Sequence, residues 1–233
     1  MKLSLVIPCY NEVLNLPLLL ERCADFPVSA GVEVILVDNG STDNTAQVLL
    51  DLLPKYSGCR SVRVELNQGY GFGILSGLRA AKGEILAWTH ADMQTDPLDV
   101  LKGLVFFEQH GDKAFVKGRR YGRPITDVFF TIGMSLFESI LLRKGMWDIN
   151  AQPVMFSRSF FEGWTDAPTD FSLDLYTYFN AKNKGLRVCR FPVRFGERAH
   201  GESHWNVNWN AKWKFIQRTV SFSLRLRKGL SQK

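Results

Sequence analysis

The chain has few cysteines. There are four in 233 residues, Cys9, Cys23, Cys59 and Cys189, and no two of them form a C-x-x-C pair. This spacing fits neither a zinc site nor the disulfide framework of a small secreted protein. We therefore expect reduced thiols in a cytoplasmic protein.

Long hydrophobic runs are also lacking. The apolar run over residues 3–7 is too short for a secretory signal peptide. The most apolar segment, residues 128–142, is short for a membrane-spanning helix and contains Glu138. Internal repeats and low-complexity linkers are missing as well. We expect one continuous domain without a membrane-spanning helix.

Acidic residues are in the minority. The chain has 29 Lys and Arg against 23 Asp and Glu, which gives a net charge of +6 and an isoelectric point near 9.2. This surplus indicates an anionic partner, and a nucleotide, a phospholipid surface and a nucleic acid all satisfy it. The rest of the composition, 45% hydrophobic and 22% charged, is that of a globular protein with a sizeable core.

Short apolar runs alternate with helical patterns in the first half. Strands are expected over residues 3–7, 34–37, 62–66 and 85–89, and helices over 16–26, 45–53 and up to Lys82. In the second half, we expect strands over 113–117, 153–157 and 186–195, and helices up to His110 and over 127–143, 170–183 and 206–228. The alternation predicts an α/β fold, in which helices flank both faces of a mostly parallel sheet.

The end of the fourth predicted strand carries His90, Asp92 and Gln94. In an extended chain these three alternate residues point to one side. Three potential ligands at the carboxyl end of a strand indicate a site for a hard cation and for the phosphates that it neutralises. The alternative is a helix-capping loop with one solvated Asp, because Asp96 and Pro97 suit the start of a helix.

The ends of two other predicted strands carry residues that suit a nucleotide. Tyr10 can pack on a base, Glu12 can hold ribose hydroxyls and Asp38 can accept a hydrogen bond from a base N–H. The glycine-rich segment over residues 67–73 precedes a helix, as phosphate-binding loops do. Its spacing is neither G-x-G-x-x-G nor a Walker loop, so a flexible turn explains it equally well.

Taken together, these segments resemble the family 2 glycosyltransferases with the GT-A fold. The segments that match, in order and spacing, are Pro8-Cys9-Tyr10-Asn11-Glu12, residues 37–45, Asn67-Gln68-Gly69, Ala91-Asp92-Met93-Gln94 with Asp96-Pro97, Gly118-Arg119-Arg120-Tyr121 and residues 198–203. The last two resemble the dolichyl-phosphate mannose synthase-like branch. The resemblance covers roughly residues 3–204 and implies inverting transfer of a sugar from a nucleotide-diphosphate sugar.

The resemblance also implies roles for individual residues. The nucleotide-sugar-binding residues would be Pro8, Tyr10, Glu12, Asp38, Asn67, Gly69, His90, Ala91 and Asp92. Asp92 and Gln94 would bind Mg²⁺ or Mn²⁺, which stabilises the leaving nucleotide as a Lewis acid. Arg119 and Arg198 would hold phosphates through bidentate contacts.

His90 departs from this pattern, because the family usually has Asp there. Loss of that carboxylate is expected to weaken metal binding without nucleotide. His90 can instead contact ribose or a phosphate oxygen, or bind the metal itself. Imidazole is a poor ligand for Mg²⁺ and a more tolerable one for Mn²⁺.

The nature of the acceptor depends on whether a general base is present. A phosphate acceptor is already anionic, whereas a sugar hydroxyl needs a base. Asp174 stands roughly where many family members with hydroxyl acceptors keep that base, and Asp148 is a second candidate. Asp170, four residues before Asp174, is expected to cap the helix that both begin.

The C-terminal tail combines tryptophans with cations. Trp205, Trp209 and Trp213 recur every four residues, with Lys212, Lys214, Arg218, Arg225, Arg227 and Lys228 around and after them. This pattern is typical of a helix that lies in a membrane interface. A core-packing stripe with a solvated basic face explains it too, and single-stranded nucleic acid is a third partner with this chemistry.

The sequence thus predicts a metal-dependent inverting glycosyltransferase that acts on polyprenyl phosphate at the inner membrane face. Residues 1–97 form the nucleotide-sugar half and 98–204 the acceptor half of one domain, followed by a basic helix over 205–233. One alternative is a same-fold enzyme that acts on a hydroxyl of lipopolysaccharide, capsule or another glycan. A second is a binding protein for nucleotide sugars or nucleic acid that has lost turnover.

Overall fold

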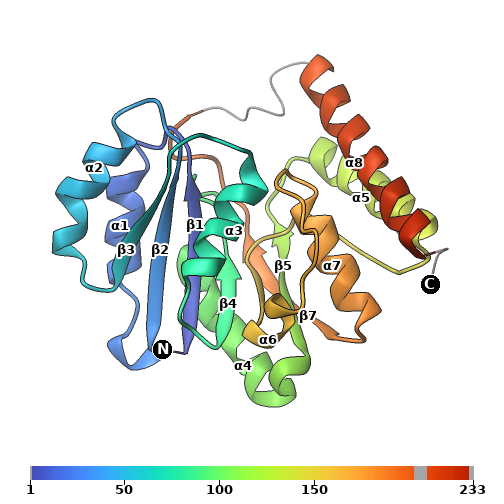
Figure 1. Cartoon of the computed structure of the whole chain (residues 1–233), viewed down its shortest axis with the longest axis horizontal. Coiled ribbons are helices and arrows are strands. Elements are labelled where there is room, and N and C mark those ends of the chain that lie inside the picture. Colours follow the sequence, from blue (N-terminus) through green and yellow to red (C-terminus); the bar gives the residue numbers. More distant parts are fainter. Residues whose placement is uncertain (1, 202–208, 231–233) are drawn as a thin grey trace.

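The computed structural model describes residues 2–201 and 209–230 and contains a seven-stranded mixed sheet (Figure 1). Its strand order is β3-β2-β1-β4-β6-β5-β7. The strands are β1 (Leu3–Cys9), β2 (Val32–Asn39), β3 (Cys59–Val64), β4 (Ile85–Trp88), β5 (Ala114–Tyr121), β6 (Val154–Ser157) and β7 (Arg187–Arg194).

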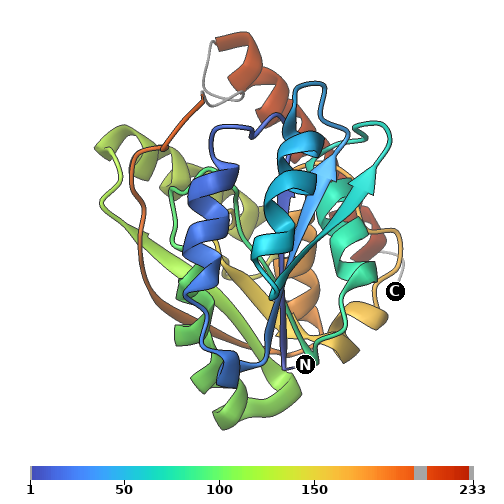
Figure 2. The same ribbon diagram turned by 90° about the vertical axis from the view of Figure 1, so that its left-hand side faces the viewer.

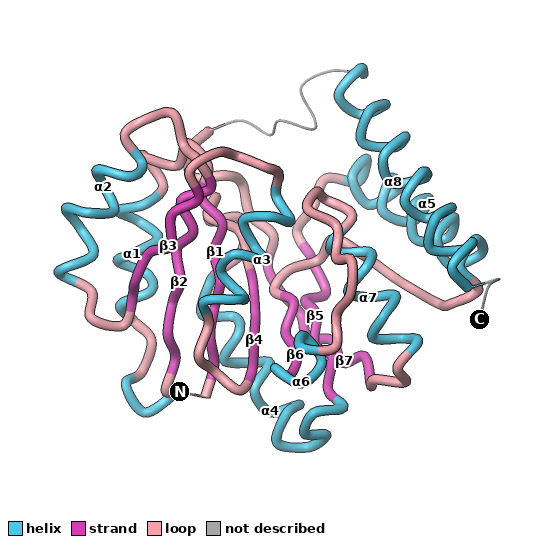
Figure 3. The backbone as a smooth tube through the Cα atoms, viewed as in Figure 1, coloured by secondary structure: helices cyan, strands magenta, loops and turns pink. Residues whose placement is uncertain are grey.

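The α-helices are α1 (Leu16–Ala24), α2 (Thr45–Leu52), α3 (Tyr70–Ala80), α4 (Val100–His110), α5 (Ile125–Leu142), α6 (Arg158–Glu162), α7 (Leu173–Asn183) and α8 (Trp209–Leu230). Each long helix predicted from the sequence is present, with ends that move by a few residues. The short helix α6 follows β6 directly and was not predicted. Figure 3 shows how strand and helix alternate through the first half of the chain.

The sheet is mostly parallel, as predicted. β1 pairs in parallel with β2 and β4, and Cys9 lies beside Asp38 at the ends of β1 and β2. β6 runs antiparallel to both β4 and β5, and so joins the two halves of the sheet. The carboxyl ends of β1, β2 and β4 therefore meet at one edge, which is where ligands bind in open α/β sheets.

Two apolar cores form because successive side chains of each strand point to opposite faces. In β1, Leu5 and Ile7 pack with α1, α2 and α4 on one face, while Val6 packs with α3 on the other. Helices α6 and α7 also cover this second face. Figure 2 shows the molecule from the side of α1 and α2. The two layers hold the sheet edge rigidly, so its loops can carry a site.

Helix α5 corrects one expectation from the sequence. It spans Ile125–Leu142, close to the predicted 127–143, and, among the described helices, is the one long and apolar enough to cross a membrane by length and composition, where no such helix was expected. Only 17% of this helix is buried inside the protein. It lies beside α8 at one side of the molecule (Figures 1 and 3).

Candidate active site

The loops after β1 and β2 are tied together by hydrogen bonds. The backbone N–H of Asn11 donates to Ser41 Oγ at 3.1 Å, and the N–H of Thr42 donates to Asn11 Oδ1 at 2.9 Å. The N–H of Glu12 donates to Thr45 Oγ1 at 2.9 Å. Two motifs that stand far apart in the sequence therefore form one wall of the site.

Asp38 lies in this wall with an unused acceptor. Its side chain is 2% exposed, and Oδ1 accepts the Ser41 N–H at 3.0 Å. The second oxygen, Oδ2, is buried and finds no donor among the described residues. A buried acceptor without a donor is costly, so a ligand N–H at this place would be favourable. Tyr10 is 37% exposed two residues beyond Pro8, at the same edge.

The glycine-rich loop packs closely on the second loop. Asn39 Nδ2 donates to the Gly69 carbonyl at 3.0 Å, and the Gly69 N–H donates to Asn67 Oδ1 at 2.8 Å. Gly69 has a φ of +112°, and a Cβ there would stand 2.6 Å from the Thr169 carbonyl oxygen. Glycine is thus required both by backbone conformation and by close packing. Asn67 and Gly69 thus lie in a loop that packs against Asn39 and Thr169, and their part in nucleotide-sugar binding stays a prediction.

The segment from His90 to Gln94 is a turn, which corrects the expected extended conformation. β4 ends at Trp88, and Met93 has a φ of +58°. Asp92 Oδ1 accepts the N–H of Gln94 at 3.1 Å, which closes the turn locally. Asp92 and Ala91 are 4% and 3% exposed, so Asp92 is not the solvated carboxylate of a simple capping loop.

The segment after β7 covers this turn. Gly196 N–H donates to the Gln94 carbonyl at 2.8 Å, and Gln94 Nε2 donates to the Gly196 carbonyl at 3.2 Å. Arg198 then pairs with Asp92, with 2.9 Å between Nη2 and Oδ2. The predicted residues Asp92, Gln94 and Arg198 are therefore in contact.

Glu12 lies close to the same group. Asn15 Nδ2 donates to Glu12 Oε2 at 2.5 Å and to the His200 carbonyl at 3.3 Å. Burial, and to a lesser degree the Asp92 carboxylate, raises the pKa of Glu12. The matched segments that begin at Pro8 and at Arg198 therefore lie side by side.

His90 lies near three charged side chains at this edge of the sheet, those of Asp92, Arg120 and Arg198. Burial, and then the nearby Arg198 and Arg120, lower the pKa of His90, while Asp92 opposes them. A neutral imidazole retains one lone pair for a donor or a metal ion. The ring centroids of His90 and Tyr70 are 5.8 Å apart, and Tyr70 stacks on Phe171.

Arg120 is half-buried and close enough to His90 to affect its pKa, whereas the predicted Arg119 is exposed on β5. Arg120 Nε donates to both oxygens of Asp148 at 3.2 Å, and Arg123 is 3.8 Å from the same carboxylate. After the opposing effect of burial, these arginines hold the pKa of Asp148 below its ordinary value. Such a carboxylate is a poor general base.

Asp174 is also inaccessible. It is 3% exposed, and Gln152 Nε2 stands between it and Tyr70, at 3.3 Å from Asp174 Oδ1 and 2.8 Å from the Tyr70 hydroxyl. Burial raises its pKa to about 6, and the neighbouring Lys117 opposes this rise. Lys117 is fully buried, and burial lowers its pKa to about 7. Asp170 accepts the Ser172 N–H at 2.9 Å in the turn before α7, rather than capping the helix itself.

The donors at this edge suit a cation that also binds phosphate. Among the described residues, no cluster of three or more His, Cys, Asp or Glu side chains is arranged around a metal position. Asp92 and Gln94 each carry a side-chain oxygen in the same turn, and Mg²⁺ commonly binds one or two carboxylates together with substrate phosphates. These residues thus fit a metal that arrives with the nucleotide.

Sequence reasoning missed Arg120, Arg123, Lys117 and Gln152 as neighbours of the site. Arg119, the predicted phosphate ligand, directly precedes Arg120, and its role stays a prediction. The sequence does not identify Lys117 as a neighbour of the site, because a single lysine in an apolar strand is expected to be exposed to solvent. The tryptophan row cannot be compared, because Trp205 and the side chains of Trp209 and Trp213 lie outside the described residues.

Solved structures of similar fold are glycosyltransferases. A mannosyltransferase from Pyrobaculum calidifontis, in complex with GDP-Man and Mn²⁺, superposes with a TM-score of 0.70 at 21% identity, over 96% of this chain and 64% of that chain. Glucosyl-3-phosphoglycerate synthase from Mycobacterium tuberculosis, with Mn²⁺, UDP-Glc and phosphoglyceric acid, gives 0.70 at 20% identity, over 98% and 80%. The predicted GT-A fold is thereby confirmed.

Curated relatives match part of the chain. The undecaprenyl-phosphate 4-deoxy-4-formamido-L-arabinose transferase of Pseudomonas paraeruginosa is 40% identical over 101 residues, which is 42% of this chain and 30% of that protein. The enzyme of the same name from Aeromonas hydrophila is 39% identical over 101 residues, 42% and 31% of the two chains. The matched part thus spans under a third of these relatives.

The family model for glycosyl transferase family 2 matches residues 4–161. This range includes the loops after β1, β2, β3 and β4 that build the site, together with Arg120 and Asp148. The chain therefore belongs to glycosyl transferase family 2.

Proposed function

We propose that the protein is a metal-dependent, inverting glycosyltransferase that moves a sugar from a nucleotide-diphosphate sugar to polyprenyl phosphate. The choice of acceptor rests on the surroundings of the two candidate general bases, Asp148 and Asp174. Asp148 is paired with two arginines, and Asp174 is buried behind Gln152. A phosphate acceptor needs no base, and Arg120 offers positive charge beside the site. The undecaprenyl-phosphate relatives support the same acceptor class.

The nucleotide would bind across the loops after β1, β2 and β3. Asp38 Oδ2 would accept the base N–H that it lacks in the free protein, and Tyr10 would pack on the base. Glu12 would hold ribose hydroxyls beside the Asn15 amide. The loop that contains Asn67 and Gly69 would place its backbone close to the nucleotide sugar. These roles follow from one unpaired acceptor and from the loops that surround it.

The leaving diphosphate would be neutralised at Asp92. A divalent cation on Asp92 and Gln94 would supply Lewis-acid stabilisation of the leaving oxygens, as the Mn²⁺ complexes of the structural relatives suggest. Arg198 already holds Asp92 and would turn toward a phosphate oxygen. His90, neutral near pH 7, would accept a hydrogen bond from the donor or bind the cation.

The transfer itself would be a single displacement. The acceptor phosphate oxygen attacks the anomeric carbon, the bond from this carbon to the diphosphate oxygen breaks, and the configuration inverts. Arg120 would orient the acceptor phosphate through its guanidinium. No protein nucleophile takes part, which agrees with the pairing of Asp148.

A donor and acceptor panel tests this proposal. UDP- and GDP-sugars are incubated with detergent-dispersed undecaprenyl phosphate, with Mn²⁺, Mg²⁺ or EDTA, and the products are resolved by mass. We expect a glycosyl phosphate lipid, formed only with a divalent cation. Transfer to glycan hydroxyls alone would favour the hydroxyl acceptor. Donor binding without any transfer or hydrolysis would favour a binding protein.

The protein is further proposed to work at the cytoplasmic face of the membrane, because the acceptor lipid is held there. Its positive charge suits an anionic surface. This proposed function requires no nucleic acid partner.

A further inference from the structure

Two cysteines that are far apart in the sequence meet where the parallel strands begin. Cys23 lies in the last turn of α1, and Cys59 is the first residue of β3. Because β1 and β2 are parallel, the helix between them must return to the edge where the strands start (Figure 2). Cys59 is the register partner of Val34, whose side chain packs in the same apolar cluster as Cys23. The fold therefore places both thiols on the face of the sheet that α1 and α2 cover.

The two thiols are in contact. The Cys23 side chain is hydrogen-bonded to that of Cys59, and both are free cysteines. The other two cysteines have different partners, since Cys9 and Cys189 each donate to the carbonyl two residues earlier in their own strand, at 3.5 and 3.7 Å. Cys23 and Cys59 are thus paired thiol to thiol, although no C-x-x-C spacing announces them in the sequence.

The two thiols differ in exposure and in acidity. Cys23 is 4% exposed, whereas Cys59 is half-buried and follows the exposed Gly58, where an added Cβ would meet no heavy atom within 4 Å. The hydrogen bond from Cys23 lowers the pKa of Cys59, and burial opposes it. The same hydrogen bond, together with burial, raises the pKa of Cys23. Cys59 is therefore the thiol that ionises first and that a small oxidant can reach, and Cys23 is the protonated donor behind it.

Both cysteines lie at the ends of their elements. A disulfide requires the two sulfur atoms to approach to about 2.05 Å, so the backbone must be able to adjust. β3 is the outermost strand on its side of the sheet and is paired with β2 alone. Its first residue, Cys59, can shift with the loss of few hydrogen bonds, and Cys23 stands two residues before the end of α1 at Asp25. The thiol contact can therefore close into a bond without rearrangement of the core.

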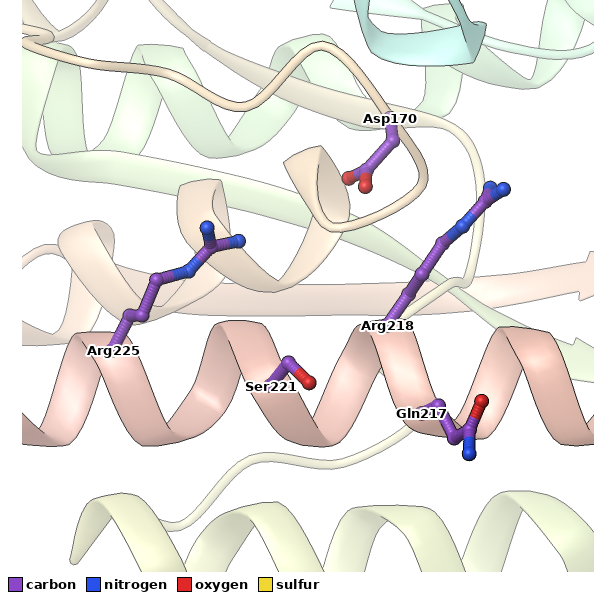
Figure 4. A pocket seen from close by; sticks show the side chains of 5 residues that line it. All are labelled: Asp170, Gln217, Arg218, Ser221 and Arg225. Carbon is purple, nitrogen blue, oxygen red and sulfur yellow. The ribbon is translucent and has the colours of Figure 1, made fainter.

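The thiol pair is separate from the polar sites of the molecule. Asp38 stands four residues beyond Val34 in β2, which is about 13 Å at 3.3 Å per residue. In the cavity that Figure 4 shows, Arg218 and Arg225 of α8 face Asp170, and no thiol is among the described residues that line it. The pair belongs neither to the candidate active site nor to this cavity, so its chemistry is independent of the proposed sugar transfer.

We propose that Cys59 and Cys23 form a reversible disulfide when the protein meets a hydroperoxide. The bond would join the last turn of α1 to the start of β3 and close the loop that contains β2 and α2. In the reducing cytoplasm that the sequence predicts for this protein, such a pair is a dithiol at rest and is oxidised transiently. Exchange with a reduced dithiol returns it to the thiol form.

The oxidation has two steps. The Cys59 thiolate attacks the peroxide, the O–O bond breaks, and the leaving oxygen takes up a proton as water or alcohol, which leaves a sulfenic acid on Cys59. The Cys23 sulfur then attacks the Cys59 sulfur, the S–S bond forms, and the sulfenic oxygen departs as water with the Cys23 proton. The two thiols lose two electrons in total, and the hydroperoxide gains them.

Mass spectrometry of the full chain tests the pair. The reduced protein is treated with hydrogen peroxide, alkylated with iodoacetamide in denaturant and digested. We expect the peptides that contain Cys23 and Cys59 to be linked, with the loss of two hydrogen atoms, and dithiothreitol should separate them. In Cys23→Ser, the sulfenic acid on Cys59 should persist and give at least tenfold more dimedone adduct than the wild type. Cys189→Ser is the matched control, and it should form the link as the wild type does.

Two results would overturn the proposal. One is full alkylation of both Cys23 and Cys59 after peroxide treatment, because the contact would then be unreactive. The other is a link from Cys23 to Cys9 in place of Cys59. Both results are read from the wild-type protein, so they do not depend on the folding of a variant.

Discussion

At the scale of single residues, Asp92 combines two functions. Its oxygens close the turn after β4 and pair with Arg198, and the side chain is almost fully buried. An exposed carboxylate at a strand end, as the strand-end position suggests, would contribute little to stability. The buried ion pair means that Asp92→Ala would remove a partner from Arg198 and disturb the fold as well as the chemistry.

The substitution Asp92→Asn separates these functions. It keeps the shape and the acceptor for the Gln94 N–H but removes the charge that would hold a cation. Sugar transfer should fall by roughly two to three orders of magnitude, since metal stabilisation of a leaving group is worth several kcal/mol. Thermal unfolding checks the fold. Full transfer activity in the folded variant would remove the metal site from Asp92.

A second prediction concerns His90. His90→Asp adds an oxygen donor beside Asp92, so activity should persist and the Mn²⁺ concentration for half-maximal rate should fall. The measurement is a metal titration of transfer at saturating donor. His90→Ala is the control, because it removes the imidazole without adding a ligand. Complete inactivity of the Asp variant would assign His90 a specific contact of its own.

Strand-end reasoning correctly placed Asp38, Asp92 and Glu12 at one edge, because parallel strands deliver their carboxyl ends together. It did not predict that Arg120 would bind Asp148, because adjacent residues in a strand point to opposite faces and both Arg119 and Arg120 are arginine. The surroundings of Lys117 could not be predicted from the sequence either. A buried lysine is recognisable only when Asp174 and its neighbours are brought beside it by distant parts of the chain.

At the scale of elements, the contact between α5 and α8 holds a titratable group. Burial raises the pKa of Glu138 to about 7, and the Ser223 hydroxyl opposes this only in part. A carboxyl whose pKa is higher in the folded protein than in the unfolded chain stabilises the fold when protonated. Its contribution is complete below the ordinary pKa near 4.5 and is lost as the pH rises through 7.

The substitution Glu138→Gln should therefore raise the free energy of unfolding by an amount that depends on pH. The variant should match the wild type near pH 4.5 and be more stable by about 3 kcal/mol at pH 8, because the glutamine stays neutral. Urea unfolding at several pH values measures the difference. Glu65→Gln, at an exposed glutamate after β3, is the matched control for loss of a surface carboxylate. A constant difference at all pH values would mean that folding does not raise the pKa of Glu138.

The order of elements was predictable, whereas their pairing was not. Apolar periodicity located the strands and long helices because local side-chain burial follows it. The direction of β6 and its position between β4 and β5 depend on contacts between distant segments. Helix α5 begins two residues before its predicted start, since Ile125 and Thr126 continue the helix toward β5.

At the scale of the whole molecule, the tail behaves as part of the fold. Phe222 of α8 is buried in the same core as Leu142 and Met146. A boundary after His204, as the sequence suggests, would leave Glu138 and Leu142 uncovered. We propose that residues 209–230 and the α/β domain form one folding unit.

Truncation after His204 should therefore lower the unfolding temperature by several degrees and raise aggregation, rather than only weaken membrane binding. Differential scanning calorimetry measures the change, and removal of residues 231–233 alone serves as the control. An unchanged unfolding temperature would support an independent tail. Loss of vesicle binding in the truncated protein would then be assigned to α8.

The antiparallel position of β6 has a consequence for synthesis on the ribosome. All four side chains of β4 are buried in the finished sheet, yet the partner on its outer edge, β6, is translated much later. At 5–20 residues per second the edge of β4 stays open for roughly 3–14 s. The nascent protein thus presents an apolar strand edge that chaperones can bind and through which two growing chains can associate.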